Sequence, residues 1–412
     1  MTDAPEKTPA YSWYALGLLM LIYVLNFLDR TIIYILFPLI KKEMAFSDTQ
    51  LALLGTTSFV IFYTVLGIPF GKIADRGSRT RLIAIGVIVW SIFSGLTAFA
   101  TDFWTLFGCR VMVGFGEATL GPAAISLLSD YFPPLRRATV TSIYSMGIAI
   151  GAGLAALLGG SLSQFGWRTA FMVIGFPGAL LGVLAFFLRE PTRAVNAAVD
   201  TSYSSSDWKK LLRNKAFIFL CAGYALLGLA TNNLSIWGAT FYSRVHKFDL
   251  PTIGFWGGVL TLAAGIPATL FGGVIADRFK KKGYGRMLFG SILSLISVPF
   301  WLILIFTDNV YFILLANFVL LAAALSWLGA AAADVTEIAG ISLRGLGVAI
   351  YFFSVNIAAY LIGSNLIGFL SDRLGGTADP SMMRYALLVC PSACLISAVC
   401  LWLGATETSR RS

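Results

Sequence analysis

Twelve apolar runs constrain the fold of this 412-residue chain more than any other feature. Each run has about the 20 residues that an α-helix needs to cross the roughly 30 Å of hydrocarbon in a membrane. The runs occupy residues 13–40, 47–74, 82–100, 103–128, 138–162, 169–188, 216–242, 252–276, 287–306, 310–333, 346–370 and 385–403. The pattern predicts an all-α membrane protein with twelve transmembrane helices.

The composition argues against a soluble protein. Hydrophobic residues make up 58% of the chain and charged residues only 12%, whereas a typical soluble domain has about 25% charged residues. Residues 1–10 are proline-rich and of mixed charge, and the first apolar run is too long for the core of a signal peptide. We therefore expect no cleavable signal peptide.

The placement of the basic residues predicts the orientation. The net charge is +10, but if the first loop is external, about 20 of the 30 basic residues fall on one side of the membrane and about 7 on the other. The richer side holds Lys7, Arg76, Arg79, Arg81, Arg136, Arg137, the basic residues of 189–215 and 278–286, Arg344, Arg410 and Arg411. Such a bias marks the cytoplasmic face. We expect a protein of the cytoplasmic (inner) membrane with both termini in the cytoplasm and no nucleic-acid partner.

Cysteine and histidine usage gives no sign of a catalytic or metal centre. All five cysteines (Cys109, Cys221, Cys390, Cys394 and Cys400) fall within apolar runs, where a thiol behaves as a small hydrophobic side chain. His246 is the only histidine, which removes most support for a metal cluster or a histidine-based triad. We expect no disulfide framework, no metal, no cofactor and no enzymatic activity.

An internal repeat divides the chain into two halves. GKIADR at 71–76 returns as GVIADR at 273–278, each time at the end of the second run of a set of six. The stretch SDYFPPLRRATVTSIYS, which begins at Ser129, also aligns without a gap with TEIAGISLRGLGVAIYF, which begins at Thr336. A repeat of this length identifies two copies of one structural unit.

The repeat predicts two six-helix lobes, at 13–188 and 216–403. Residues 189–215 then form a cytoplasmic linker, and residues 1–12 and 404–412 form cytoplasmic tails. In transporters built from two parallel halves, the substrate binds between the halves near the membrane midplane.

The fourth run carries two opposite charges at membrane depth. Arg110, Gly114 and Glu117 are spaced i, i+4 and i+7, so they share one helix face. A charged side chain at the bilayer centre costs roughly 2.5–3.5 kcal/mol even on insertion scales, so this face is expected to contact protein or water. We predict that Arg110 binds an anionic substrate group or keeps Glu117 deprotonated, and that Glu117 couples transport to protons.

The first run carries Asn26, Asp29 and Arg30 near its middle. Asn26 and Asp29 share a helix face, whereas Arg30 points about 100° away from it. Acids at this depth are typical of proton relays in transporters. We therefore predict a proton-coupling role for Asp29 and a substrate-binding role for Asn26. The alternative for Asp29 is a structural ion pair with Arg30 or with another helix.

Amide and aromatic side chains in the seventh and eleventh runs are candidates to line a substrate site: Asn232, Asn233, Trp237, Phe352, Asn356 and Tyr360. The last three recur every four residues and share a helix face. A mixed aromatic and amide surface suits a ligand with an apolar chain and a polar head. Ordinary packing between helices is the alternative.

Two motifs carry a family resemblance that covers residues 13–403. GKIADRGSRTR at 71–81, with its echo GVIADR, resembles the loop motif of the major facilitator superfamily, and RVMVGFGEA at 110–118 resembles that superfamily's fourth-helix arginine motif. The resemblance implies the major facilitator superfamily fold. In detail, Gly77 is displaced from the usual DRxGRR order, and the second copy gives way to FKKKGYG.

A narrower resemblance points to a substrate class. NFLDRTII at 26–33 and VGFGEA at 113–118, followed by GPAAISLLSDYFPPLRRA, are similar to the Spinster-like transporters, which are associated with sphingolipids and lysolipids. That family's first-helix acid falls on Asp29, its fourth-helix arginine on Arg110 and its fourth-helix acid on Glu117. The resemblance implies proton-coupled export of a lipid-like amphiphile. A related family of organic-anion importers has a YxxRxNxS-like first-helix pattern, which this chain does not follow.

These assignments predict a secondary active transporter that works by alternating access. When substrate displaces the contact to Arg110, the partner acid takes up a proton. Cytoplasmic ion pairs are expected to close one side of the protein, and their strength would bias its two states. The candidate gate residues are Asp75, Arg76, Arg79, Asp130, Arg137, Asp277, Arg278, Glu337 and Arg344.

The expected partners are a lipid or other amphiphilic small molecule as substrate, protons and membrane lipid. We expect the protein to be a monomer. Two alternatives stay open, namely a transporter of a small organic anion or drug-like compound and a passive lipid transporter without proton coupling.

Overall fold

The computed structural model describes residues 9–133, 136–191, 205–376 and 378–409. These residues are mostly helical, and no strand occurs among them. Within these described ranges, twelve helical stretches are long and apolar enough to cross a membrane, which confirms the predicted all-α fold. Lys7, Arg410, Arg411 and residues 192–204 of the predicted linker lie outside the described residues.

Contacts within the chain group it into two compact units. Unit 1 comprises Met1–Met44 and Thr57–Ala198, and unit 2 comprises Ala45–Thr56 and Val199–Ser412. The boundary near Ala198 falls within the predicted linker. Residues 45–56, most of which fall in the predicted N-terminal lobe, belong to unit 2.

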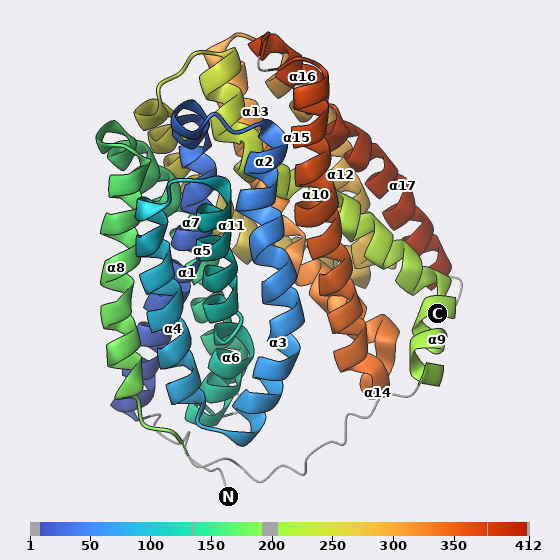
Figure 1. Cartoon of the computed structure of the whole chain (residues 1–412). Helices are drawn as coiled ribbons and strands as arrows, with labels where there is room; N and C mark the ends of the chain where they lie inside the picture. Colours follow the sequence, from blue (N-terminus) through green and yellow to red (C-terminus); the bar gives the residue numbers. More distant parts are fainter. Residues whose placement is uncertain (1–8, 134–135, 192–204, 377, 410–412) are drawn as a thin grey trace, which may run out of the picture. The chain divides into compact units, whose positions relative to one another are not determined.

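The helices are labelled in Figure 1. Unit 1 contains α1 (Ala10–Met44), α3 (Ser58–Arg76), α4 (Arg79–Leu96), α5 (Phe103–Glu117), α6 (Leu120–Tyr131), α7 (Arg137–Leu162) and α8 (Trp167–Phe186), with 3₁₀ turns at Thr97–Phe99 and Ser163–Phe165. Unit 2 contains α2 (Asp48–Ala52), α9 (Ser205–Arg213), α10 (Lys215–Val245), α11 (Leu250–Lys281), α12 (Arg286–Phe306), α13 (Val310–Ser326), α14 (Leu328–Asn356), α15 (Ser364–Arg373), α16 (Met383–Ala386) and α17 (Val389–Ser409), with a π-helical turn at Ile357–Gly363 and a 3₁₀ turn at Pro380–Met382.

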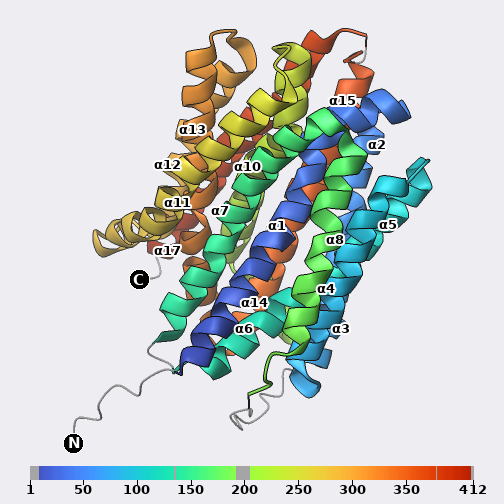
Figure 2. The ribbon, with the colours of Figure 1, turned by 90° about the vertical axis from the view of Figure 1, so that its left-hand side faces the viewer.

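Close glycine contacts fix the helices of unit 1 that carry the predicted site. In Figure 2, α1 lies beside α7 and α4 beside α8. A Cβ added at Gly151 of α7 would lie 2.4 Å from the backbone oxygen of Val24 in α1, and one at Gly175 of α8 would lie 2.3 Å from the backbone nitrogen of Gly95 in α4. Small residues permit such close approach between membrane helices. The helix α1, which carries Asp29, is therefore held tightly against α7.

The predicted fourth run is divided into two helices. Asp102 caps α5, because its Oδ1 atom accepts the N–H groups of Trp104 at 2.8 Å and Thr105 at 3.0 Å. The helix ends at Glu117, and α6 begins at Leu120. The single helix predicted over 103–128 is thus interrupted, and Glu117 occupies the last position of α5.

The predicted second run, 47–74, is also interrupted. The short helix α2 leads into α3 through a π-helical turn, Leu53–Thr57. Such turns are rare, and they often occur at functional positions in helices. The boundary between the two contact units falls at the end of this turn.

A buried ion pair holds α2 within unit 2. Arg244 donates to both carboxylate oxygens of Asp48, whose side chain is completely buried. Ser371 also donates to Asp48, at 2.6 Å. Asp372 accepts the backbone N–H groups of Asp48 at 2.9 Å and Thr49 at 2.8 Å. The carboxylate of Asp372 thereby satisfies two N–H groups that a helix start leaves without a partner.

Asp48→Asn is expected to destabilise the protein strongly. The substitution removes the counter-charge of Arg244, and breaking a buried pair in this way costs about 3–5 kcal/mol. Glu43→Gln is the matched control, because Glu43 pairs with Arg168 and the two side chains are 48% and 33% exposed. An exposed pair contributes about 0–1 kcal/mol. Thermal unfolding in detergent measures both variants, and equal losses of Tm would contradict this account.

Candidate functional site

A buried ionic cluster lies inside unit 1, on α1 and α5. Asp29 and Glu117 are each 1% exposed, and Arg110 is 0% exposed. Asn26, one turn before Asp29, is 2% exposed. Protein encloses all four side chains, as the cost of placing charge in hydrocarbon requires.

Arg30 is the ion-pair partner of Glu117. Its Nη2 atom lies 2.8 Å from Oε2 of Glu117, and its Nε atom lies 3.2 Å from the same oxygen. The sequence predicts that Arg30 points away from the face that carries Asp29, and it gives Asp29 as an alternative partner, but it does not indicate Glu117. The partner lies on another helix, so no local pattern in the sequence could identify it.

Asp29 is held from a third helix. Ser94 of α4 donates its hydroxyl to Oδ1 of Asp29. Arg110 interacts electrostatically with both Asp29 and Glu117. The two acids thus share one positive neighbour, and each has a different hydrogen-bond donor.

Arg110 has a buried guanidinium with unused donors. Its Nε, Nη1 and Nη2 atoms have no hydrogen-bond partner among the described residues, and neither has Oε1 of Glu117. A guanidinium carries five N–H donors, and buried polar groups are normally hydrogen-bonded. Such a fork is well suited to bind a phosphate or a carboxylate. Arg110 is therefore the strongest candidate for an anion-binding group in the described part of unit 1.

Three aromatic rings contact Arg30. Its Cζ atom lies 4.4 Å from the ring centroid of Phe59, 4.9 Å from that of Tyr63 and 5.0 Å from that of Phe27. Contacts of this kind contribute about 0.5–2 kcal/mol. No sequence pattern identifies these rings, because a ring that faces a cation looks the same in sequence as one that faces lipid. We call Phe27, Phe59 and Tyr63 the aromatic cage.

Two of the predicted lining residues are completely buried inside unit 2. Asn233 and Trp237 are each 0% exposed. Their side chains donate to the backbone oxygens of Ala359 at 3.2 Å and Ser364 at 3.3 Å. These contacts favour the packing alternative for both residues.

The other lining residues are more accessible. Tyr360 donates its hydroxyl to Oδ1 of Asn232 at 2.9 Å, and Phe352 is 52% exposed. Asn356 ends α14 and Tyr360 lies in the following π-helical turn, so α-helical spacing does not continue between them. The shared face predicted from that spacing is therefore distorted, and the substrate-binding role of these residues stays a prediction.

Arg79 is the centre of an ionic cluster where α4 begins. The side chain is 2% exposed, and it pairs with Asp130 of α6 and, at 2.7 Å, with Glu190. Burial alone would raise the pKa of Glu190, but hydrogen bonds from the Thr80 N–H and from Arg79 outweigh it and hold that pKa below its usual value. Glu190 lies in the predicted linker and was not among the predicted gate residues.

The structure gives less evidence on the gating role of the other residues predicted in unit 1. Arg76 and Arg137 are exposed, and the side chain of Asp75 lies outside the described part of the structure. The gating role of these residues stays a prediction.

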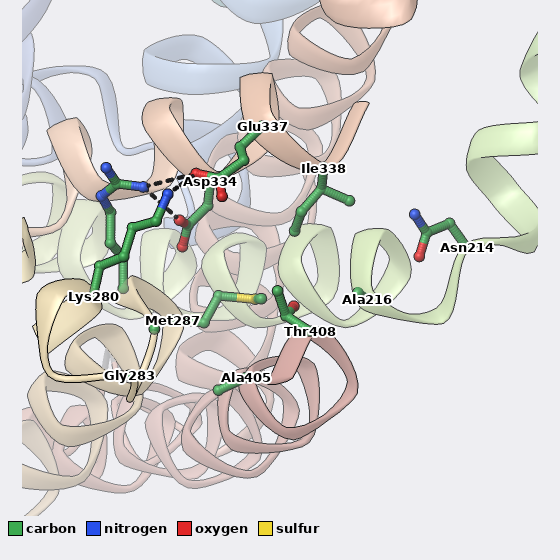
Figure 3. A pocket seen from close by; sticks show the side chains of 12 residues that line it. Asn214, Ala216, Lys280, Gly283, Met287, Asp334, Glu337, Ile338, Ala405 and Thr408 are labelled. Carbon is green, nitrogen blue, oxygen red and sulfur yellow. Dashed lines mark hydrogen bonds and ion pairs between the residues drawn. The ribbon is translucent and has the colours of Figure 1, made fainter. Parts of the chain in front are cut away.

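A second ionic cluster borders a cavity of about 530 Å³ in unit 2 (Figure 3). Lys280 and Arg286 both pair with Glu337. Arg286 also contacts Asp277 at 2.7 Å and Asp334 at 3.3 Å. The sequence predicts gate roles for Asp277 and Glu337, but it misses the arginine that joins them and the buried acid beside it. The other two predicted residues, Arg278 and Arg344, are exposed.

Asp334 lies inside a helix, although the sequence places it in a loop. The helix α14 has two parts that meet at a kink at Gly340, whose non-helical φ of 71° favours glycine, and Asp334 lies in the first part. Asp334 is consequently 7% exposed, and its Oδ2 atom has no hydrogen-bond partner among the described residues.

Comparisons with known sequences identify the family. The family model of the Major Facilitator Superfamily matches residues 19–293 and 220–412. An MFS-type efflux pump of Mycolicibacterium smegmatis is 29% identical over 99% of this chain and 96% of the pump. Protein spinster homolog 1 of Xenopus laevis is 27% identical over 90% of this chain and 76% of that protein.

Solved structures agree with this result. A bacterial homolog to the human lysosomal transporter Spinster, crystallised in an inward-facing and unoccupied conformation, matches with a TM-score of 0.82 and 26% identity over 98% of this chain and 97% of that chain. The inward-facing and occupied conformation matches with a TM-score of 0.81. This chain is a multi-pass membrane transporter related to the Spinster proteins, and it belongs to the Major Facilitator Superfamily.

Proposed function

We propose that this protein is a proton-coupled transporter of a lysolipid- or sphingolipid-like amphiphile with an anionic head group. It works by alternating access in the cytoplasmic membrane, with both termini in the cytoplasm. The single observation that carries the proposal is the buried guanidinium of Arg110, which lies beside two buried acids. Its Nε, Nη1 and Nη2 donors have no hydrogen-bond partner among the described residues.

Arg110 recognises the head group. A phosphate or carboxylate accepts two parallel hydrogen bonds from a guanidinium, and the low dielectric strengthens this contact. The carboxylates of Asp29 and Glu117 balance the charge of Arg110 when no substrate is bound. Each of them already accepts a hydrogen bond from another side chain, so Arg110 is available for the substrate.

Glu117 and Asp29 couple binding to protons. When an anionic head group binds to Arg110, it neutralises the charge of the guanidinium. Arg110 then stabilises the buried carboxylates of Glu117 and Asp29 less. A buried carboxylate that loses its positive neighbour binds a proton more readily. Substrate and proton therefore bind together, and the pair crosses the membrane with less net charge than the substrate alone.

Relatives bear on the substrate class, and they support both the proposal and one alternative. The Spinster resemblance supports an amphiphile. A hexuronate transporter of Bacillus subtilis, 27% identical over 92% of this chain, supports a small organic anion instead. Arg110 suits the acidic group of either substrate, so the apolar chain of the ligand decides between them.

A competition experiment on purified protein separates these candidates. We expect lysophosphatidylglycerol, with one chain and one negative charge, to bind, and glucuronate, with the charge alone, not to displace it. Lysophosphatidylcholine tests the head group, and we expect it to bind at least about 10-fold more weakly because its net charge is zero. Efficient displacement by glucuronate would overturn the amphiphile and favour the organic anion.

A further inference from the structure

The aromatic cage around Arg30 has no role in the binding of substrate by Arg110 or in the uptake of a proton by Glu117 and Asp29. An arginine that already has an ion-pair partner at 2.8 Å needs no further contact to balance its charge. Energetically significant cation–π contacts occur only about once per 70–80 residues, yet three converge on this one guanidinium. A special requirement on the position of Arg30 would explain this concentration.

The cage holds Arg30 from two helices. Phe27 lies on α1, three residues before Arg30, and Phe59 and Tyr63 lie one turn apart on α3. The rings of Phe59 and Tyr63 are stacked, with centroids 5.2 Å apart, and Phe59 is 2% exposed. Neutral ring faces attract a cation whatever the charge of a neighbouring acid. Their attraction for Arg30 therefore persists when Glu117 is protonated.

A separate contact ties the cage to the helix that carries Glu117. A Cβ added at Gly114 of α5 would lie 2.9 Å from the backbone oxygen of Phe59 and 3.3 Å from its Cα atom. The backbone of α3 thus lies directly on α5 at this glycine. Phe59 is consequently fixed relative to Glu117, three residues further along α5.

We propose that Phe27, Phe59 and Tyr63 are positioning residues that keep Arg30 beside Glu117 after Glu117 takes up a proton. The inference rests on the proposed function, because it requires Glu117 to be a proton-coupling acid. With the cage intact, Arg30 stays next to the protonated acid and favours release of the proton. Without it, Arg30 is held less firmly beside a neutral Glu117, which stabilises the protonated form.

Other charged and titratable groups surround Glu117 and limit the size of the effect. Asp29 and Tyr23 on α1, Tyr63 on α3 and Arg110 on α5 interact with Glu117 or with Arg30. The ring of Tyr23 is stacked on Tyr144 of α7, with centroids 4.3 Å apart. None of these groups changes in the variants below except Tyr63.

The test is the pH profile of transport in proteoliposomes that contain the full chain. For the double variant Phe59→Leu with Tyr63→Leu, we expect the pH of half-maximal rate to rise by about one unit, which is a tenfold change in proton affinity. Each single variant is expected to shift it by a smaller amount in the same direction. Tyr63→Phe keeps the ring face, so it should leave the midpoint unchanged.

Phe62→Leu is the matched control on the same helix. Phe62 is 37% exposed and is not one of the rings that contact Arg30, so we expect the wild-type midpoint. Thermal unfolding shows whether each variant is folded, and the single variant Tyr63→Leu carries the test if the double variant does not fold.

Glu117→Gln distinguishes the two ways in which the inference can fail. If this variant loses the pH dependence and the cage variants keep the wild-type midpoint, the cage is not a positioning element, and the proposed function stands. If Glu117→Gln keeps the pH dependence, the proton-coupling role fails and the cage inference fails with it.

Discussion

Glu117→Gln is expected to reduce pH-driven transport to the level of protein-free liposomes. Glutamine resembles glutamate in shape and still accepts a hydrogen bond from Arg30, but it takes up no proton. Exchange of labelled for unlabelled substrate without a pH gradient should continue, because the anion site at Arg110 is retained. The two assays on the same preparation separate loss of coupling from loss of binding.

Asp29→Asn identifies which acid carries the proton. Asp29 accepts a hydrogen bond from Ser94, and Glu117 is paired with Arg30, so the two positions differ in their donors. We expect a smaller loss for Asp29→Asn if Glu117 is the principal carrier. Undiminished pH-driven uptake in both variants would remove the proton role from this cluster.

Arg110→Gln is expected to weaken binding of an anionic amphiphile by at least roughly 30-fold. Truncating one partner of a buried, hydrogen-bonded charge pair costs about 2–5 kcal/mol, and 2 kcal/mol corresponds to that factor. The substitution also leaves Asp29 and Glu117 without their shared positive neighbour. Binding to the purified protein is the direct measurement.

Two further variants show whether the shape of the guanidinium matters. Arg110→Lys keeps the charge but loses the planar fork, so we expect an intermediate loss. Arg168→Gln is the control, because Arg168 is a partly exposed arginine at a helix start, 33% exposed and outside the cluster. Equal binding by the wild-type protein and Arg110→Gln would contradict the assignment of Arg110.

The sequence predicts the architecture because the governing signal is local. A run of about 20 apolar residues identifies a membrane helix without knowledge of its neighbours. Asp29, Arg110 and Glu117 are recognisable for a related reason, since an ionisable residue inside such a run stands out by its cost. Their burial agrees with this expectation.

The pairing of those residues is tertiary and escapes the sequence. Helical spacing predicts that Arg30 diverges from Asp29, but only the tertiary structure brings the side chain of Arg30 on α1 to Glu117 on α5. The contact of the cage rings on α3 with Arg30 cannot be predicted from the sequence for the same reason. Helix breaks are equally hard to foresee, because the turns at Leu53–Thr57 and after Glu117 interrupt runs whose hydropathy is continuous.

One ionic contact is common to both copies of the internal repeat, although their loop sequences differ. In the second copy of the loop motif, FKKKGYG replaces the stretch that carries the later arginines of the first copy. Even so, Arg286 at the start of α12 pairs with Glu337. In the same way, Arg79 at the start of α4 pairs with Asp130. Glu337 and Asp130 occupy the same column of the aligned repeat. The contact is kept in both halves even though the loop that precedes the second arginine is longer.

Proton exchange on substrate binding tests the central claim most directly. Lysophosphatidylglycerol is titrated calorimetrically into the purified protein in two buffers of different ionisation enthalpy at the same pH. Coupled binding predicts proton uptake, seen as an enthalpy that depends on the buffer in the wild-type protein and not in Glu117→Gln. The same binding enthalpy in both buffers for the wild-type protein, across the pH range in which it transports, would contradict the account.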